Sequence, residues 1–161
     1  MLASAALMAT QRVGTNRRSK GKKAQEGLVR RALAGAGLVE APGRTVSTLA
    51  AAPEPGQFCG ESYLGNRKAD FLVRLWDHRI MPIECKVSNS ATNSVKRLNN
   101  DAAAKAEAWL KDFGTRQVVP VAVLGGVYKL RNLEDAQGRG LALFWAHRLN
   151  ELTDWIETTR G

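Results

Sequence analysis

The chain is poor in the residues that build disulfide scaffolds and zinc sites. Its 161 residues include only two cysteines, Cys59 and Cys85, and only two histidines, His78 and His147. The cysteines lack CxxC spacing, so a disulfide framework is excluded and a closed Cys/His zinc site is not expected. No apolar run approaches the roughly 18 residues of a membrane-spanning helix. The 44% hydrophobic content argues against global disorder. These limits favour one soluble domain with no membrane association.

A secretory signal is also missing from the start of the chain. The opening MLASAALMA is mildly apolar, but it lacks a charged segment before it and is followed by basic residues. That order is the reverse of a secretory signal. We therefore expect a cytoplasmic protein with reduced thiols.

The basic charge is concentrated at one end. Residues 1–31 hold eight basic side chains and one acid, a net +7, whereas the other 130 residues hold 16 basic and 14 acidic side chains. Clustered Lys and Arg gain affinity for a polyanion by releasing its condensed counterions. Nucleic acid is the leading partner. A solubilising or lipid-binding tail is the alternative, although no amphipathic apolar stripe accompanies the charges from 12 to 23.

Hydrophobic periodicity predicts the order of the elements. Residues 1–20 have no sustained period and are expected to form a flexible basic arm, followed by one domain over residues 21–161. Apolar spacings of three and four predict a first helix at 22–36, a long second helix at 95–113 that ends at Gly114, and a closing helix at 149–156. Proline and glycine make 40–65 a long connection with one short strand near 46–49.

Strand patterns supply the centre of the fold. Segments 68–75 and 80–87 alternate around a turn at 76–79, which predicts a hairpin. The apolar runs 118–124 and 141–146 are typical of interior strands covered on both faces. Helices and strands in this order predict an α/β fold, with a central mixed β-sheet flanked by helices.

The second strand of the hairpin carries the candidate chemistry. Alternation places Glu84 and Lys86 on one face and Cys85 on the other, and the hairpin brings Asp70 alongside. Two neighbouring carboxylates repel unless a cation lies between them, and oxygen ligands open to water suit Mg²⁺, with Mn²⁺ as a substitute. Lys86 is then placed to position the attacking water or help deprotonate it. An acid-x-Lys triplet occurs by chance about once per chain of this size, so a surface ion pair on an edge strand is the alternative.

Glu26 on the first helix is a supporting candidate. It lies at the margin of the apolar stripe, facing the sheet more than the solvent. An inward acid needs a partner. That partner is the metal, reached directly or through water, or else a salt bridge to Arg30 or Lys22.

These residues resemble the PD-(D/E)XK nuclease superfamily, through Ala69-Asp70 and Glu84-Cys85-Lys86, with Glu26 fitting the acid often found on its first helix. The resemblance covers most of residues 20–156 and departs from the motif where Ala69 replaces proline. The run ECKVSNSATNSVKRLNND is similar to type II restriction endonucleases of the XamI kind. The resemblance implies a restriction-endonuclease-like core that hydrolyses DNA phosphodiesters. It assigns Asp70, Glu84 and the carbonyl of Cys85 as metal ligands and Lys86 as the catalytic lysine.

Hydroxyl, amide and cationic side chains gather at the arm and just after the lysine. Such groups contact phosphates, and Asn or Arg also reads base edges. Ordinary helix capping by Thr92 or Ser94 is the plainer interpretation of the second group. The expected DNA-binding residues are Arg17, Arg18, Lys20, Lys22, Lys23, Ser88, Asn89, Asn93, Lys96 and Arg97.

The sequence thus predicts a Mg²⁺-dependent DNA endonuclease. Two alternatives remain open: a structure-specific nuclease resembling Holliday-junction resolvases, and a non-catalytic DNA-binding subunit of a larger complex. A subunit that only bound DNA would not need two carboxylates facing the phosphates, because their negative charges would oppose binding. One site cuts one strand, so we expect a homodimer. Its apolar surface is expected either around Trp155 and Ile156 or on the exposed side of the second helix.

Overall fold

The computed structural model describes the backbone of residues 11–161 and the side chains from Lys20 onward. Residues 1–10 of the predicted arm lie outside this part, as do the side chains of Arg17 and Arg18. Helix α2 runs from Gln11 to Gly35, so residues 11–20 are helical where the sequence predicts a flexible arm. Among the described side chains of α2, the apolar Val29 and Leu33 are buried, whereas the sequence of residues 11–20 contains one apolar residue, Val13. The early turns therefore carry no hydrophobic period that sequence could detect.

The main sheet has six strands in the order β1-β3-β6-β7-β8-β9. Neighbours β1/β3, β7/β8 and β8/β9 are parallel, while β6 is antiparallel to both β3 and β7. The predicted mixed α/β sheet and its hairpin are confirmed, and His78 has the positive φ of 78° expected in the hairpin turn. The strands are β1 (Val39–Ala41), β3 (Gln57–Cys59), β6 (Phe71–Arg74), β7 (Ile80–Ser88), β8 (Val121–Gly126) and β9 (Ala142–Trp145).

A smaller sheet lies beside the hairpin. It is ordered β2-β4-β5, from β2 (Thr45–Val46), β4 (Ser62–Leu64) and β5 (Arg67–Ala69). The prediction of one short strand within 40–65 is therefore wrong, since β1, β2, β3 and β4 all fall in or beside that segment, together with the 3-10 turn η1 (Leu49–Ala51). Each of these strands is only two or three residues long, too short for an alternating pattern to show.

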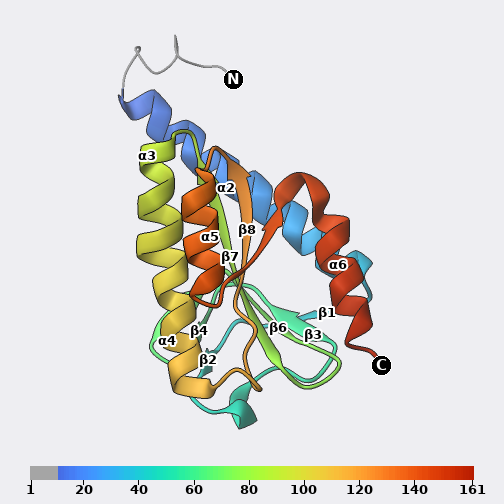
Figure 1. Cartoon of the computed structure of the whole chain (residues 1–161). Coiled ribbons are helices and arrows are strands. Elements are labelled where there is room, and N and C mark those ends of the chain that lie inside the picture. Colours follow the sequence, from blue (N-terminus) through green and yellow to red (C-terminus); the bar gives the residue numbers. More distant parts are fainter. Residues whose placement is uncertain (1–10) are drawn as a thin grey trace.

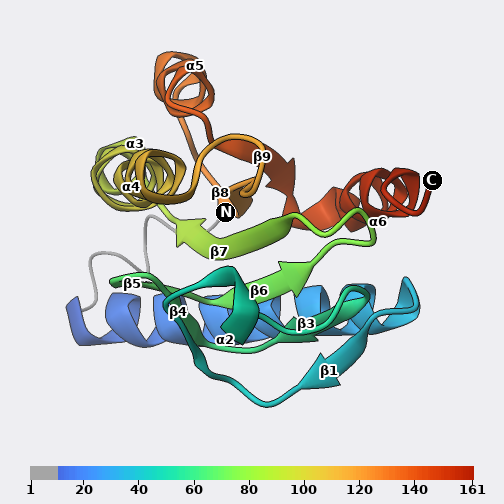
Figure 2. The same ribbon diagram turned by 90° about the horizontal axis from the view of Figure 1, so that it is seen from below.

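Helices cover both faces of the main sheet (Figures 1 and 2). One face packs against α2 and α6 (Leu149–Thr158), which follows the 3-10 turn η3 (Ala146–Arg148). The other face packs against α5 (Leu130–Gly138) and a long helix that is continuous through α3 (Ala91–Ser94), η2 (Val95–Ala102) and α4 (Ala103–Phe113). Segment η2 is a π-helix. Helix α5, which the sequence analysis missed, buries only Ala136 completely.

The closing helix directs Leu152 and Ile156 into the core. Ile156 is fully buried in the core that α2 and α6 share with the sheet. Trp155 packs against the same core, with the Arg79 guanidinium 5.5 Å from its ring centroid. Ile156 therefore cannot contribute to the predicted docking surface, and of the two residues only Trp155 is partly exposed. Within residues 11–161, no helix combines the length and apolar character needed to cross a membrane.

Candidate active site

Asp70 lies where the two sheets part, between β5 and β6. Its backbone N–H still donates to the Ile83 carbonyl at 3.0 Å. At the next hydrogen-bonding position along β7, the Asp70 side chain replaces a backbone acceptor, and its Oδ2 accepts from the Cys85 N–H at 2.8 Å. Asp70 is thereby fixed beside β7. The hairpin brings this carboxylate to the strand that carries Glu84, as the sequence predicts.

Glu84 and Lys86 lie together on one face of β7 and are nearly enclosed. The side chain of Glu84 is 2% exposed and that of Lys86 is 10% exposed, and Lys86 Nζ lies 3.3 Å from Glu84 Oε1. Cys85 points into the core on the opposite face, in agreement with the predicted alternation. Burial and the charge of Asp70 raise the pKa of Glu84, although both Lys86 and Lys105 oppose that shift.

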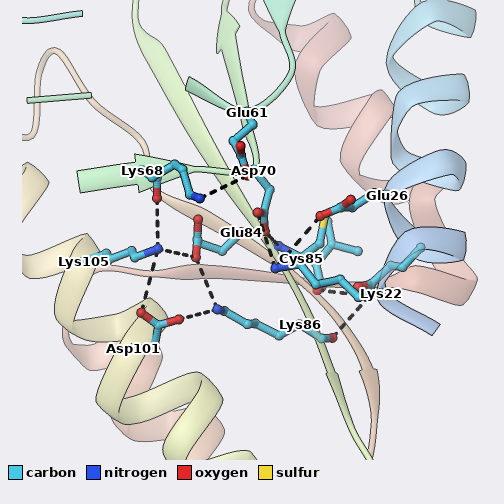
Figure 3. A network of polar contacts seen from close by, with 12 residues as sticks. Lys22, Glu26, Glu61, Lys68, Asp70, Glu84, Cys85, Lys86, Asp101 and Lys105 are labelled. Carbon is cyan, nitrogen blue, oxygen red and sulfur yellow. Dashed lines mark hydrogen bonds and ion pairs between the residues drawn. The ribbon is translucent and has the colours of Figure 1, made fainter. Parts of the chain in front are cut away.

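Two further charged residues reach the site from the long helix (Figure 3). Lys105 on α4 donates to Glu84 Oε1 at 3.0 Å and to the Lys68 carbonyl at 2.9 Å. Asp101 on η2 forms an ion pair with Lys86 and lies 3.8 Å from Lys105. Burial alone would lower the pKa of Lys86, but Glu84 and Asp101 outweigh it, so the pKa is raised. The sequence analysis missed both residues, because no short-range pattern connects them with β7.

Glu26 approaches the site from the other side, on α2. Lys22 lies between the two acids, 4.0 Å from Glu26 Oε2 and 3.4 Å from Asp70 Oδ1. Burial and the charge of Asp70 raise the pKa of Glu26, and Lys22 opposes that rise. Of the two predicted salt-bridge alternatives, the structure shows Lys22, because Arg30 pairs with Glu40 instead. Glu26 is thus close enough to Asp70 for the two carboxylates to interact electrostatically.

The oxygen atoms of Glu84 differ in a way that bears on metal binding. Oε1 accepts both ammonium groups, whereas Oε2 is buried without a hydrogen-bond partner. An unpaired buried carboxylate oxygen is costly, and a hard cation is one group that satisfies it. Among the described residues, no three His, Cys, Asp or Glu side chains converge on one metal position. The expected donor set of Asp70, Glu84 and the Cys85 carbonyl needs only two side chains, and it fits an oxygen-preferring divalent ion.

Side-chain contacts anchor this end of β7 to α2. Gln25 is buried, and its Nε2 donates to the carbonyls of Lys86 at 3.3 Å and Val123 at 3.2 Å. A Cβ atom on Gly21 would lie 3.5 Å from a Val87 side-chain carbon. Helix α2 therefore crosses β7 beside the lysine. Lys20 and Lys23, both exposed on α2, flank this crossing.

The loop after β7 contains the other expected DNA contacts. Asn89 and Lys96 are exposed, and Asn93 is half-buried. Arg97 on η2 is also partly buried, and its Nε is enclosed. These residues follow Ser88, the last residue of β7, so they lie at the end of the strand that α2 crosses. The described α2 lysines and this loop, which represent the two predicted groups, thus share one end of β7.

Two predictions for this loop need correction. Ser88 is 1% exposed, and its hydroxyl donates to the Ser90 carbonyl at 2.8 Å, so it is enclosed by its own loop and does not face DNA. The helix is capped by Ser90, whose Oγ accepts from the Asn93 N–H, and the predicted caps Thr92 and Ser94 lie inside the helix. Ser90 has the extended backbone of an N-cap, which the helical residues after it lack.

Comparison with known proteins identifies relatives of the chain. Residues 1–145 match the family described as XamI restriction endonuclease. The chain is similar to the type II restriction enzyme XamI of Xanthomonas campestris pv. amaranthicola, with 58% identity over 120 residues. That match covers 74% of this chain but 44% of the relative, so the chain spans less than half the length of that enzyme. The resemblance stated from the sequence is confirmed.

A solved structure agrees with the fold. The crystal structure of protein VC1899 from Vibrio cholerae aligns with a TM-score of 0.57 and 19% sequence identity. The alignment covers 95% of this chain and 38% of the other. At this level of identity the similarity shows the fold alone.

Proposed function

The chain belongs to the XamI restriction endonuclease family, and from this membership and the site geometry we propose that it is a metal-dependent DNA endonuclease. The general class is that of the PD-(D/E)XK nucleases. The observation that carries the proposal is the environment of Glu84. One oxygen of its carboxylate holds two lysines, and the other is buried and unpartnered beside Asp70.

Mg²⁺ is the proposed cofactor, with Mn²⁺ as a substitute. Asp70, Glu84 and the carbonyl of Cys85 would hold the ion, and Glu26 would support it through water. When bound, such an ion neutralises phosphate charge and increases the acidity of a coordinated water molecule. The structure supports this assignment through the fixed position of Asp70, whose Oδ2 is anchored by the Cys85 N–H.

In addition to the metal ion, Lys86 would supply positive charge to the reacting groups. Its ammonium is held between Glu84 and Asp101 on the face of β7 that carries the proposed ligands. From there it would donate to the attacking water or to a phosphate oxygen. A donor fixed in advance stabilises developing charge without reorganising during the step.

DNA would lie along the end of β7 crossed by α2. The exposed Lys20 and Lys23, with Lys22 beside Asp70, present positive charge there. Asn89, Asn93, Lys96 and Arg97 would contact the backbone or base edges from the loop and the helix that follows. Arg17 and Arg18 stay predicted contacts. The structure supports the arrangement because both groups adjoin one strand end.

We propose a homodimer for double-strand cleavage, or a larger complex if another subunit supplies recognition. The cytoplasmic location stays a prediction. Because the chain spans 44% of the length of XamI, the sequence specificity of that enzyme is not part of the proposal.

Supercoiled plasmid tests the function directly. The purified chain is incubated with plasmid and Mg²⁺, Mn²⁺ or EDTA, beside the variants E84Q and D112N. We expect nicking or linearisation that needs the metal, is lost in E84Q and is retained in D112N, which alters an exposed carboxylate on α4. Inertness of the wild-type chain with either metal, while it still binds DNA, would favour the non-catalytic alternative.

A further inference from the structure

The π-helix beside the active site places a pair of charges that the proposed function does not use. Within η2 the hydrogen bonds span five residues, as in the Ala103 N–H that donates to the Leu98 carbonyl. One extra residue per turn changes which side chains face the sheet compared with a continuous α-helix. Such segments are rare and are frequent at functional sites. Here the segment contains Asp101, and Lys105 follows one α-helical turn later.

The π-helix is held in place by α5. Nδ2 of the buried Asn99 donates to the Asn132 carbonyl at 2.9 Å and to Asp135 Oδ2 at 2.8 Å. Arg139 donates from Nη1 to the Asn99 carbonyl at 2.9 Å. A main-chain group of η2 is thus paired with another helix. The position of Asp101 therefore depends on contacts across two helices.

Lys105 connects three elements at the site. From α4 its ammonium reaches Glu84 on β7 and the carbonyl of Lys68 on β5. Its side chain is 23% exposed, so solvent screens it only in part. Lys86 reaches the same oxygen of Glu84 from a different side, as Figure 3 shows. With Oε1 occupied twice, only Oε2 is left to face a ligand.

We propose that Asp101 and Lys105 tune the affinity of the site for a divalent cation: Asp101 holds Lys86 in place and offsets its charge, whereas Lys105 occupies Oε1 of Glu84, leaves Oε2 for the cation and competes with it through its positive charge. The inference rests on the proposed function and extends it to the long helix. Asp101 contacts neither ligand side chain in this network, and it acts through Lys86. Lys105 acts on Glu84 and adds a positive charge near the cation.

The two residues should shift metal affinity in opposite directions. Removing the Lys105 charge takes away a cation that competes for Glu84, so the K105M variant should bind a divalent ion more tightly. The negative charge of Asp101 offsets the positive charges of Lys86 and Lys105, which repel a divalent cation. The D101N variant should therefore bind the cation more weakly. Coulomb interactions at these separations predict a change of at least about fivefold each way. A loss of packing would weaken binding in both variants.

The experiment measures Mn²⁺ binding by electron paramagnetic resonance on the full chain without DNA. The free-ion signal gives the dissociation constant for wild type, K105M, D101N and the conservative variants K105R and D101E. K111M and D112N, which alter exposed residues of α4, are the matched controls. Circular dichroism confirms folding, and D101S replaces D101N if that variant does not fold. Single-turnover cleavage should fall in D101N with DNA affinity unchanged, and D101E should recover most of the rate.

Opposite shifts in K105M and D101N, with near wild-type values in K105R and D101E, support the inference. Shifts of the same sign in the two variants, or dissociation constants within twofold of the controls, overturn the inference. The proposed function stands in that case if the wild-type chain binds Mn²⁺ and cleaves DNA. A wild-type chain that binds no Mn²⁺ overturns both.

Discussion

The Asp70 carboxylate accepts the backbone N–H of Cys85 at 2.8 Å, in the place where a further rung of the β6–β7 ladder would supply a carbonyl. A side chain therefore continues the pairing of β7 after the two sheets have parted. The contact serves the fold and the site at once, because it fixes a proposed metal ligand against the strand that carries the other. These two roles can be separated by substitution.

Asp70→Asn should fold normally and fail to cut DNA. The amide keeps an oxygen that accepts the Cys85 N–H, but it removes the negative charge needed for the cation. Asp70→Ala should lose cleavage as well. It should also lower the free energy of unfolding by about 1–3 kcal/mol, because a buried N–H is left unpaired. Urea denaturation and plasmid cleavage measure the two effects. DNA binding should be equal or tighter in both variants, and undiminished cutting by either would remove Asp70 from the site.

The hairpin and the Glu84/Lys86 face were predictable from sequence because strand alternation is a local rule. Asp101 and Lys105 were not, since they meet Lys86 and Glu84 only when the long helix packs over β7. The π-helix makes this harder, because its wider turn breaks the 3.6-residue period on which helix-face predictions rest. Helix α5 was missed for a related reason. Its sequence LRNLEDAQG has few apolar residues, and one fully buried alanine gives no stripe to detect.

Lys86→Met should slow single-turnover cleavage by roughly 10²-fold, the magnitude typical of a preorganised donor to developing charge. Glu84 would keep Lys105 as a partner, so the fold should survive. DNA affinity measured with Ca²⁺ should change little, because the lysine is nearly enclosed. The control K111M removes an exposed lysine from α4 and should cut at the wild-type rate. Equal rates for K86M and K111M would show that Lys86 has no part in the chemistry.

The lysines of α2 should account for part of the salt dependence of DNA binding. K20Q and K23Q should each lower the slope of log K against log salt by about 0.9 for every phosphate that the lysine neutralises. Point substitutions test this better than removal of residues 1–20, because α2 begins at Gln11 and deletion would shorten the helix. Fluorescence anisotropy across a salt series gives the slopes, with K111Q as the control. Unchanged slopes would place the DNA away from α2.

Both thiols should be unreactive in the folded protein. Cys59 and Cys85 are fully buried, and burial raises the pKa of each thiol. The protonated form therefore persists at pH 8, where an exposed cysteine reacts readily as the thiolate. An aromatic disulfide reagent should find no reactive thiol in native protein and two per chain in guanidinium. Rapid labelling of native protein would contradict the enclosure of these side chains.

Double-strand cleavage should require two copies of the chain. A single Asp70/Glu84/Lys86 set hydrolyses one strand, and a second set oriented by a two-fold axis is the simplest way to reach the other. The core packing of Ile156 leaves only the partly buried Trp155 of the predicted contact on the C-terminal helix. The long helix, where Val95 is 36% exposed, is therefore the favoured surface. Light scattering at micromolar concentration, with and without DNA, should show a dimer. The V95D variant should be shifted towards monomer, and its product from plasmid should change from linear to nicked DNA.

A monomer that linearises plasmid in one binding event would refute the dimer, whereas a monomer that only nicks would indicate a nicking enzyme or a missing partner subunit.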